Sequence, residues 1–176
     1  MMRRLLLLRH SQSERSEPGE SDRDRKLTDR GRKDARNVGV YLARHGLVPD
    51  RVLLSSALRA QETWKHAAAA MASAPRPQVA ESLYGATAHT IFNAIAETPA
   101  EVANLFVVGH NPALHELALS LIASGDIEAR ERLREELPPA GLVIIGFSFD
   151  DWAKLHPHAG RLERFVVPQS IEPATN

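Results

Sequence analysis

Two arginines and two histidines stand just after short hydrophobic runs of the sequence. Arg9 and His10 end the run LLLLRH, Arg59 follows a second run in LLSSALRAQET, and His110 follows a third in LFVVGHNP. Guanidinium groups bind phosphate oxygens in pairs and do not lose their charge. A neutral imidazole carries a lone pair that can attack phosphorus and form a covalent intermediate. Together these residue types favour phosphoryl chemistry.

The elements that would position these residues follow from the hydrophobic pattern. Short apolar runs without alternation are typical of strands covered on both faces, as in a parallel sheet. Segments with helical spacing lie between them, and this order predicts an α/β fold with a mostly parallel sheet. Two runs joined by turn residues predict an antiparallel hairpin at the C-terminal end. The predicted strands cover residues 5–8, 52–54, 105–108 and 142–147, and the second arm of the hairpin lies in 160–168.

Two helices are predicted in the first half of the chain. Residues 35–43 carry an apolar stripe, and the sequence predicts Thr28 as the N-cap and Gly46 as the C-terminal stop of this helix. The alanine-rich segment 57–72 is strongly helical by propensity. This helix would carry Arg59 in its first turn.

The second half holds one clear helix and one ambiguous segment. Residues 112–123, PALHELALSLIA, predict a helix with Asn111 as its N-cap and Pro112 in the first helical position. Residues 125–141 are highly charged and end near two prolines. They form either a short exposed helix or a flexible excursion beside the site.

Composition narrows the classes of function. The 176 residues suit one domain, predicted over 1–167, with an unstructured tail over 168–176. Lys plus Arg and Asp plus Glu are both 22, which argues against nucleic acid or an anionic membrane as a partner. The lack of cysteine excludes disulfides and thiolate catalysis. The run of four leucines is shorter than the roughly seven apolar residues of a signal peptide, and we expect a cytoplasmic protein.

Topology brings the candidate residues together. In a parallel sheet, the loops that follow the strands all emerge at one edge, where ligands bind. Arg9, His10, Arg59 and His110 would therefore meet at this edge, near helix N-termini that favour an anion. The arginines would keep a neighbouring histidine neutral and nucleophilic. Because they also supply the positive charge, we expect neither a metal nor a cofactor.

Three motifs in this order resemble the histidine phosphatase superfamily: RH after the first strand, SSALRAQET and VVGHNP. The stretches RKLTDRGRKDA and PPAGLVIIGF look like its small branch named for SixA, the phosphohistidine phosphatases. The resemblance covers residues 5–167. It implies a three-layer α/β/α sandwich of the phosphoglycerate mutase-like type. It also implies His10 as the nucleophile, with Arg9, Arg59 and His110 completing the phosphate pocket.

The sequence departs from the mutase-like members of this family, which begin RHGxSxxN. Ser11 stands at the glycine position and Ser16 at the asparagine position, whereas Ser13 matches. Ser16 is carried over as a candidate substrate contact. Glu81, in ESLYGA, resembles the glutamate that donates a proton in family phosphomonoesterases. A phosphohistidine depends less on such an acid, because imidazole leaves readily once protonated.

The sequence predicts a metal-independent phosphatase that uses a phosphohistidine intermediate. We expect its substrate to be phosphohistidine on a protein, for which a histidine-phosphotransfer domain is a family-level candidate. A small-molecule phosphomonoesterase on the same scaffold, acting on a small phosphate ester, is the first alternative, and Glu81 favours it. A non-catalytic phosphate-binding protein is the second, and the intact set of His10, Arg9, Arg59 and His110 argues against it.

Overall fold

The computed structural model describes residues 2–171, and its central feature is a seven-stranded sheet with the order β3-β2-β4-β1-β6-β7-β5. Only β6 runs against the other strands, because its pairings with β1 and β7 are antiparallel and all other pairings are parallel. The mostly parallel sheet and the C-terminal hairpin are thereby confirmed. The strands are β1 (Arg3–Arg9), β2 (Arg51–Ser55), β3 (Gln78–Ala80), β4 (Asn104–Gly109), β5 (Ile122–Gly125), β6 (Leu142–Phe147) and β7 (Gly160–Val166).

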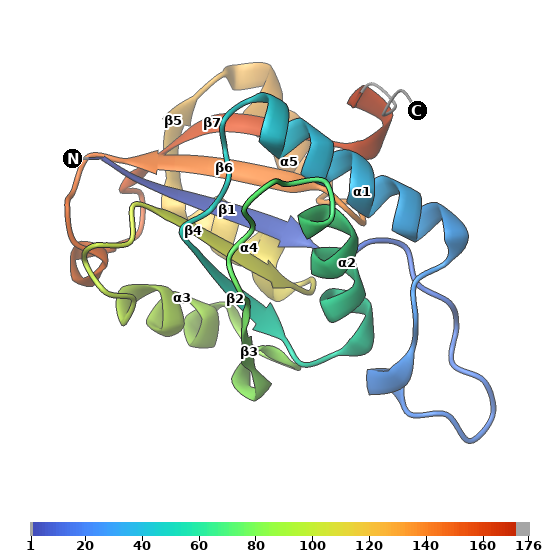
Figure 1. Cartoon of the computed structure of the whole chain (residues 1–176). Helices are drawn as coiled ribbons and strands as arrows, with labels where there is room; N and C mark the ends of the chain where they lie inside the picture. The colour runs from blue at the N-terminus through green and yellow to red at the C-terminus, as the bar shows by residue number, and fades with distance from the viewer. Residues whose placement is uncertain (1, 172–176) are drawn as a thin grey trace.

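Helices cover both faces of the sheet, which gives the expected three layers. Figure 1 shows α1 and α2 in front of the strands, and they pack on one core, whereas α3, α4 and α5 pack on the other. The five helices of the described chain are α1 (Asp29–Arg44), α2 (Leu58–Ala68), α3 (Ala88–Ala96), α4 (Ala113–Leu121) and α5 (Ile127–Glu135).

Strand β1 shows why the leucine run has no alternation. Leu5 and Leu7 belong to the core on the side of α3 to α5, and Leu6 and Leu8 belong to the core under α1 and α2. All four are fully buried because successive side chains of a strand point to opposite faces. Hydrocarbon packing on both sides therefore holds the strand that ends at the candidate site.

The pairing register of the strands places the two histidines next to each other at the edge of the sheet. The parallel pairing of β1 with β4 places Arg9 opposite Gly109. His10 and His110 each follow these paired residues by one position, so the two histidines leave the sheet side by side. Strand β2 pairs with the other edge of β4 and ends at Ser55.

Helix α1 begins where the sequence predicts. The Thr28 hydroxyl accepts a hydrogen bond from the Gly31 amide at 3.0 Å and caps the first turn. Gly46, with φ of +63°, follows the last turn in the left-handed conformation that favours glycine. Gly31 also lies against the loop after β1, because a Cβ there would stand 2.1 Å from the Gln12 carbonyl oxygen.

Three predicted boundaries are wrong. Helix α2 ends at Ala68 and not at residue 72, because the chain turns there towards the edge strand β3. Helix α4 ends at Leu121, and the following residues pair with β7 as the edge strand β5. Asn111 is not an N-cap, since α4 begins after Pro112 and the Asn111 side chain donates to the Leu137 carbonyl at 2.9 Å.

The two uncertain segments have defined structure. The charged stretch contains the helix α5, capped by Asp126, whose carboxylate accepts the Ala129 amide at 2.8 Å. Residues Pro168–Ser170, predicted as unstructured tail, form a 3₁₀ turn, and residues 172–176 lie outside the described range. The domain boundary at residue 167 stays a prediction.

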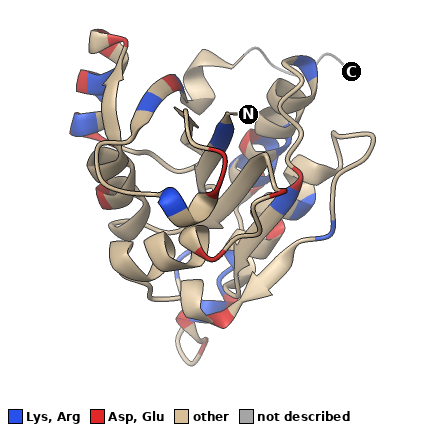
Figure 2. Cartoon of the chain, turned by 90° about the vertical axis from the view of Figure 1, so that its left-hand side faces the viewer, with Lys and Arg blue, Asp and Glu red and all other residues tan. Residues whose placement is uncertain are grey.

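Charge is mixed over the surface. Figure 2 shows basic and acidic residues interspersed on the side that it views, in keeping with equal numbers of both signs in the sequence. Within residues 2–171, no helix has both the length and the apolar character that crossing a membrane requires.

Candidate active site

A pocket of about 350 Å³ opens at the carboxyl ends of β1 and β4. The structure brings four of the six candidate residues together there, Arg9, His10, Arg59 and His110. The other residues that line the pocket are Gln12, Ser13, Arg25, Asn111 and Pro139. Three of the nine side chains are arginines and no lining residue is acidic, so the pocket favours an anion.

His10 is held with one ring nitrogen free. Its Nδ1 lies 2.8 Å from the Ser11 carbonyl oxygen, which can only accept, so Nδ1 carries the proton. Nε2 therefore keeps its lone pair. The residue is 9% exposed, and this burial, with smaller contributions from His110 and Arg59, lowers the pKa of His10 to about 3. His10 is thus neutral and nucleophilic at neutral pH.

Ser11 fixes the backbone that follows His10. Its hydroxyl donates to the Gly31 carbonyl at 2.6 Å, and its amide donates to the Thr63 hydroxyl at 2.9 Å. The Thr63 hydroxyl donates in turn to the Arg59 carbonyl at 2.7 Å. Through these bonds the residue after His10 is tied to both α1 and α2. The serine that departs from the mutase-like pattern therefore has a structural role.

His110 lies against His10, with 5.1 Å between the ring centroids. Its Nε2 is 2.7 Å from the Ser55 hydroxyl, which also accepts the Ala57 amide at 3.2 Å. The serine proton can therefore go to Nε2, which leaves the proton of the ring on Nδ1. Nδ1 is buried without a partner in the described structure and can donate to a bound oxygen. Burial and then Arg59 lower the pKa of His110 to about 4.

Arg9 is positioned by the loop before β6. Its Nη1 donates to the Leu137 carbonyl at 3.0 Å, the same oxygen that accepts the Asn111 side chain. The Ala140 amide bonds to the Arg9 and His10 carbonyls. Burial lowers the pKa of Arg9. The loop thus anchors the first arginine and the loop after His110 through one backbone oxygen.

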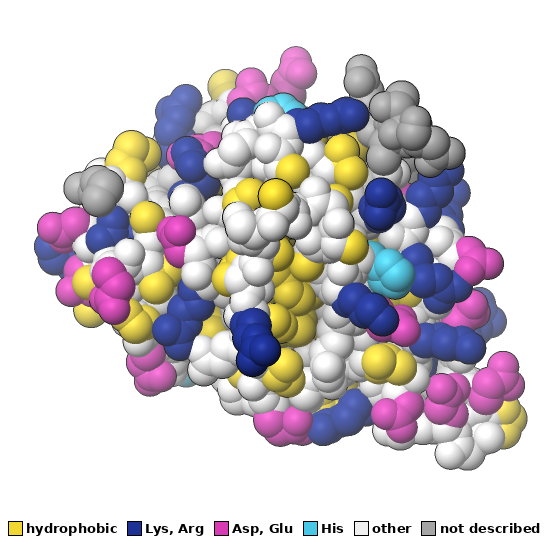
Figure 3. Space-filling model, viewed as in Figure 1, with side chains coloured by type: hydrophobic (Ala, Val, Ile, Leu, Met, Phe, Trp, Pro, Cys, Tyr) yellow, Lys and Arg dark blue, Asp and Glu magenta, His cyan; other side chains and the backbone are white. Residues whose placement is uncertain are grey.

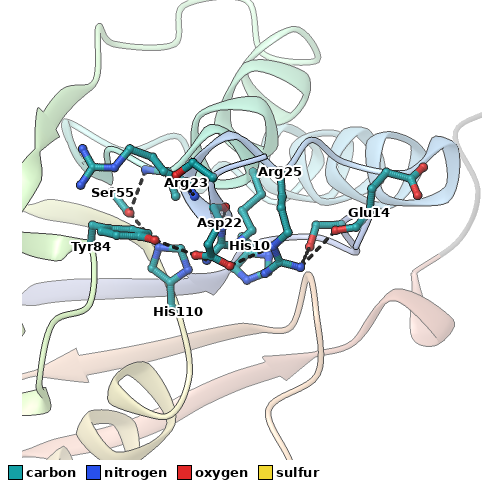
Figure 4. A network of polar contacts seen from close by, with 12 residues as sticks. His10, Glu14, Asp22, Arg23, Arg25, Ser55, Tyr84 and His110 are labelled. Carbon is teal, nitrogen blue, oxygen red and sulfur yellow. Dashed lines mark hydrogen bonds and ion pairs between the residues drawn. The ribbon is translucent and has the colours of Figure 1, made fainter. Parts of the chain in front are cut away.

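Arg59 is oriented by a residue that the sequence reasoning missed. Its Nη1 donates to the Asp22 carbonyl at 2.8 Å, and its Nη2 lies 3.2 Å from Asp22 Oδ2. Tyr84 donates its hydroxyl proton to the same Oδ2 at 2.7 Å (Figure 4). The Glu62 carboxylate, one helical turn after Arg59, is engaged elsewhere, because it accepts the Leu27 amide at 2.7 Å.

The structure does not bring Glu81 and Ser16 to the pocket. Glu81 forms an ion pair with Arg23, whose guanidinium lies over the Tyr84 ring, and the Glu81 side chain is 65% exposed. The hydrogen bond from Arg23 lowers the pKa of Glu81, so its carboxyl group is ionised. Ser16 is exposed in the loop between β1 and α1, and neither residue lines the pocket.

The other pocket residues differ in how readily they can be predicted from the sequence. Asn111 directly follows His110, and Gln12 and Ser13 lie two and three positions after His10, so closeness in the sequence is a usable signal for these three residues. Arg25 lies in the irregular loop, where its Nη1 donates to the Ser13 hydroxyl at 3.2 Å and its Nε to Asp22 Oδ1 at 3.0 Å. Nothing in the charge pattern of the loop distinguishes it. Across residues 2–171, no three His, Cys, Asp or Glu side chains gather as a metal site would need.

Residues 5–113 match the model of the histidine phosphatase superfamily, branch 1. The chain belongs to this superfamily. An uncharacterized protein of Mycobacterium tuberculosis strain H37Rv is 34% identical over 164 residues, which cover 92% of this chain and 100% of the relative. An uncharacterized chloroplastic protein of Arabidopsis thaliana is 31% identical and covers 96% of this chain, with 79% of its own length matched.

Solved structures place the enzyme beside the SixA type. A protein of Nakamurella multipartitia assigned as phosphohistidine phosphatase SixA is 25% identical, with a TM-score of 0.83 and coverage of 96% of this chain and 97% of its own. One from Agrobacterium tumefaciens with the same assignment is 26% identical, with a TM-score of 0.80 and coverage of 94% and 98%. The expected family, fold and phosphatase class are thereby confirmed.

Proposed function

We propose that this phosphatase hydrolyses phosphohistidine on a protein, with His10 as the nucleophile. The observation that carries the proposal is the state of Glu81. The carboxylate is ionised, paired with Arg23 and outside the pocket. An alkoxide leaving group needs a proton donor, and this glutamate is badly placed to supply one. An imidazole whose second nitrogen is protonated leaves as the neutral ring and needs no acid from the enzyme.

The proposed reaction has two displacements at phosphorus. His10 Nε2 forms a bond to phosphorus while the bond from phosphorus to the substrate imidazole breaks, and the electron pair of that bond stays on the departing nitrogen. Arg9, Arg59 and the Nδ1 proton of His110 stabilise the charge on the non-bridging oxygens. Water then attacks the phosphorus of phospho-His10, which releases inorganic phosphate and restores the neutral ring. The arginines provide the positive charge that a metal provides in other phosphatases.

Similarity supports the same substrate class. The two SixA-type proteins at 25% and 26% identity match this chain over nearly its full length, and both carry the assignment phosphohistidine phosphatase. On this proposal the partner is a phosphorylated protein, and a histidine-phosphotransfer domain is the candidate that the family suggests. A cytoplasmic location stays a prediction.

The test compares two leaving groups on four proteins. Wild type, His10→Ala, Glu81→Gln and the control Glu97→Gln, an exposed helix-end glutamate, are assayed with a phosphohistidine-bearing carrier protein and with an alkyl phosphate. We expect hydrolysis of phosphohistidine without added metal, unchanged within about threefold by Glu81→Gln and lost in His10→Ala by about 10³-fold or more.

Three results would contradict the proposal. Equal activity of His10→Ala would remove the nucleophile. An absolute need for Mg²⁺ would remove the mechanism. A preference for the alkyl phosphate that disappears in Glu81→Gln, but not in Glu97→Gln, would show the phosphomonoesterase instead.

A further inference from the structure

Only some of the N–H donors of the Arg59 guanidinium form hydrogen bonds within the described structure. Arginine has five N–H donors, two on each Nη and one on Nε. Asp22 takes one from Nη1 through its backbone carbonyl and one from Nη2 through its carboxylate. The Nε donor is buried and has no hydrogen-bond partner in the described structure. A buried donor without a partner is costly, and its satisfaction by a ligand would recover that cost.

The two contacts with Asp22 occupy a particular edge of the guanidinium. Nη1 and Nη2 form the end of the group, whereas Nε and Nη2 form its side. The side edge keeps the Nε proton and the second Nη2 proton, which are parallel and match two oxygens of one phosphoryl group. Arg59 is one of the residues that line the pocket, whereas Asp22 is not among them.

We propose that Asp22 is a positioning residue that turns the Nε–Nη2 edge of Arg59 towards the phosphoryl group bound beside His10, a role that rests on the proposed function of this pocket.

Asp22 is itself held from two sides, as an orienting group must be. The Tyr84 hydroxyl donates to Oδ2 at 2.7 Å, and Arg25 Nε donates to Oδ1 at 3.0 Å (Figure 4). The Arg23 guanidinium lies 4.5 Å from the centroid of the Tyr84 ring and pairs with Glu81. The hydrogen bond from Tyr84 lowers the pKa of Asp22, so its carboxyl group is ionised at neutral pH.

On this proposal, the loop between β1 and α1 serves to position Arg59 through Asp22. Figure 1 shows the loop beside the carboxyl ends of the strands, and Figure 3 shows acidic side chains gathered at the same corner of the molecule. Of the two aspartates in the 3₁₀ turn Asp22–Asp24, only Asp22 contacts Arg59. Asp24 is exposed, so it offers a matched control with the same change of charge.

The test is a double-mutant cycle on the full chain with an aryl phosphate as substrate. Asp22→Ala, Arg59→Ala, the double variant and the control Asp24→Ala are compared in kcat and KM. We expect Asp22→Ala to lower kcat/KM about 100-fold, mostly in kcat, because a misplaced group loses most in the transition state. In the Arg59→Ala background the same change should have less than about a threefold effect. Asp24→Ala should stay within about twofold of wild type.

Binding of tungstate, measured by calorimetry, provides a readout without turnover. We expect Asp22→Ala to weaken tungstate binding about tenfold, and Tyr84→Phe to weaken it less and in the same direction. Should Asp22→Ala fail to fold, Tyr84→Phe replaces it in the cycle with Arg59→Ala. Tighter tungstate binding by Asp22→Ala would make Asp22 a competitor and overturn the proposal. An undiminished effect of Asp22→Ala without Arg59 would overturn it as well.

The proposed function and the positioning role fail differently. Wild-type turnover of aryl phosphate without turnover of phosphohistidine would contradict the substrate class, while the cycle and the tungstate titration would still decide the role of Asp22.

Discussion

Neutral His10 ties the stability of the protein to pH in a way that can be measured. The native pKa is about 3, lowered chiefly by burial, against an ordinary value of 6.5. Below pH 6.5 the unfolded chain takes up a proton at this position and the native state does not. The contribution is therefore fully present above pH 6.5, is lost progressively as the pH falls, and levels off near pH 3.

The size of the effect follows from the two pKa values. Each pH unit below 6.5 costs the native state about 1.4 kcal/mol through this one residue, until the native pKa is reached. Between pH 8 and pH 5 the loss is about 2 kcal/mol, which is a large part of the stability of an ordinary domain. His10 is only 9% exposed, so solvent screening reduces the figure little.

Urea unfolding of wild type and His10→Gln between pH 8 and pH 5 isolates this contribution. Other titrating groups affect both proteins alike, so the difference between their free energies of unfolding reports on His10. We expect wild type to lose about 2 kcal/mol relative to His10→Gln over this range. The side-chain titration of His10, followed by NMR, should show no protonation above pH 5.

The reasoning would be refuted if the difference in free energy of unfolding between wild type and His10→Gln stayed constant within about 0.5 kcal/mol from pH 8 to pH 5. His10 would then ionise in the native state near pH 6.5, and the buried, neutral nucleophile would have to be abandoned.

We expect measurable effects on stability or activity from three further substitutions. Gly39→Ala should destabilise by about 2 kcal/mol or more in urea unfolding, because its Cβ would lie 2.0 Å from the Ala67 carbonyl oxygen, and full stability would mean that α1 and α2 separate freely. Thr28→Ala should cost about 1 kcal/mol by the same assay, through loss of the N-cap of α1. Ser55→Ala should lower kcat/KM about tenfold, because the hydrogen bond that orients His110 is lost, and an unchanged kcat/KM would contradict that role.

The core of the site could be predicted because it depends on strands. Buried runs without alternation identify β1, β2 and β4, and parallel pairing brings their carboxyl ends to one edge. His10 and His110 need no further information, since each follows its strand directly. Arg59 follows from its place in the first turn of the helix after β2.

The remaining parts of the site lie on irregular backbone. The loop between β1 and α1 alternates acidic and basic residues without any periodicity, so the sequence does not distinguish Asp22 from Asp24. Which carboxylate reaches Arg59 depends on the path of the loop and on its contact with Tyr84, more than sixty residues later. The expectation that Glu81 acts in the pocket rested on a motif, and its pairing with Arg23 is a tertiary contact.

Edge elements escaped the sequence reasoning for another reason. In β5 only Ile122 is buried, and the strand has just four residues, so no hydrophobic period marks it. Because these stretches have high helical propensity, the predicted helices extended past the end of α4 into β5 and past the end of α2 at Ala68. Tertiary pairing with β7 overrides propensity in the first case.

The pairing of Arg9 with Gly109 also has a consequence for the kinetics of folding. The two histidines are one hundred residues apart in the chain, and they meet only when the two central strands are joined. Closing so long a loop is slow, because its entropic cost precedes any reward from contacts. A collapsed intermediate with its helices formed would still lack the site. The recovery of phosphatase activity during refolding therefore reports when β1 and β4 pair. Circular dichroism reports when the helices form.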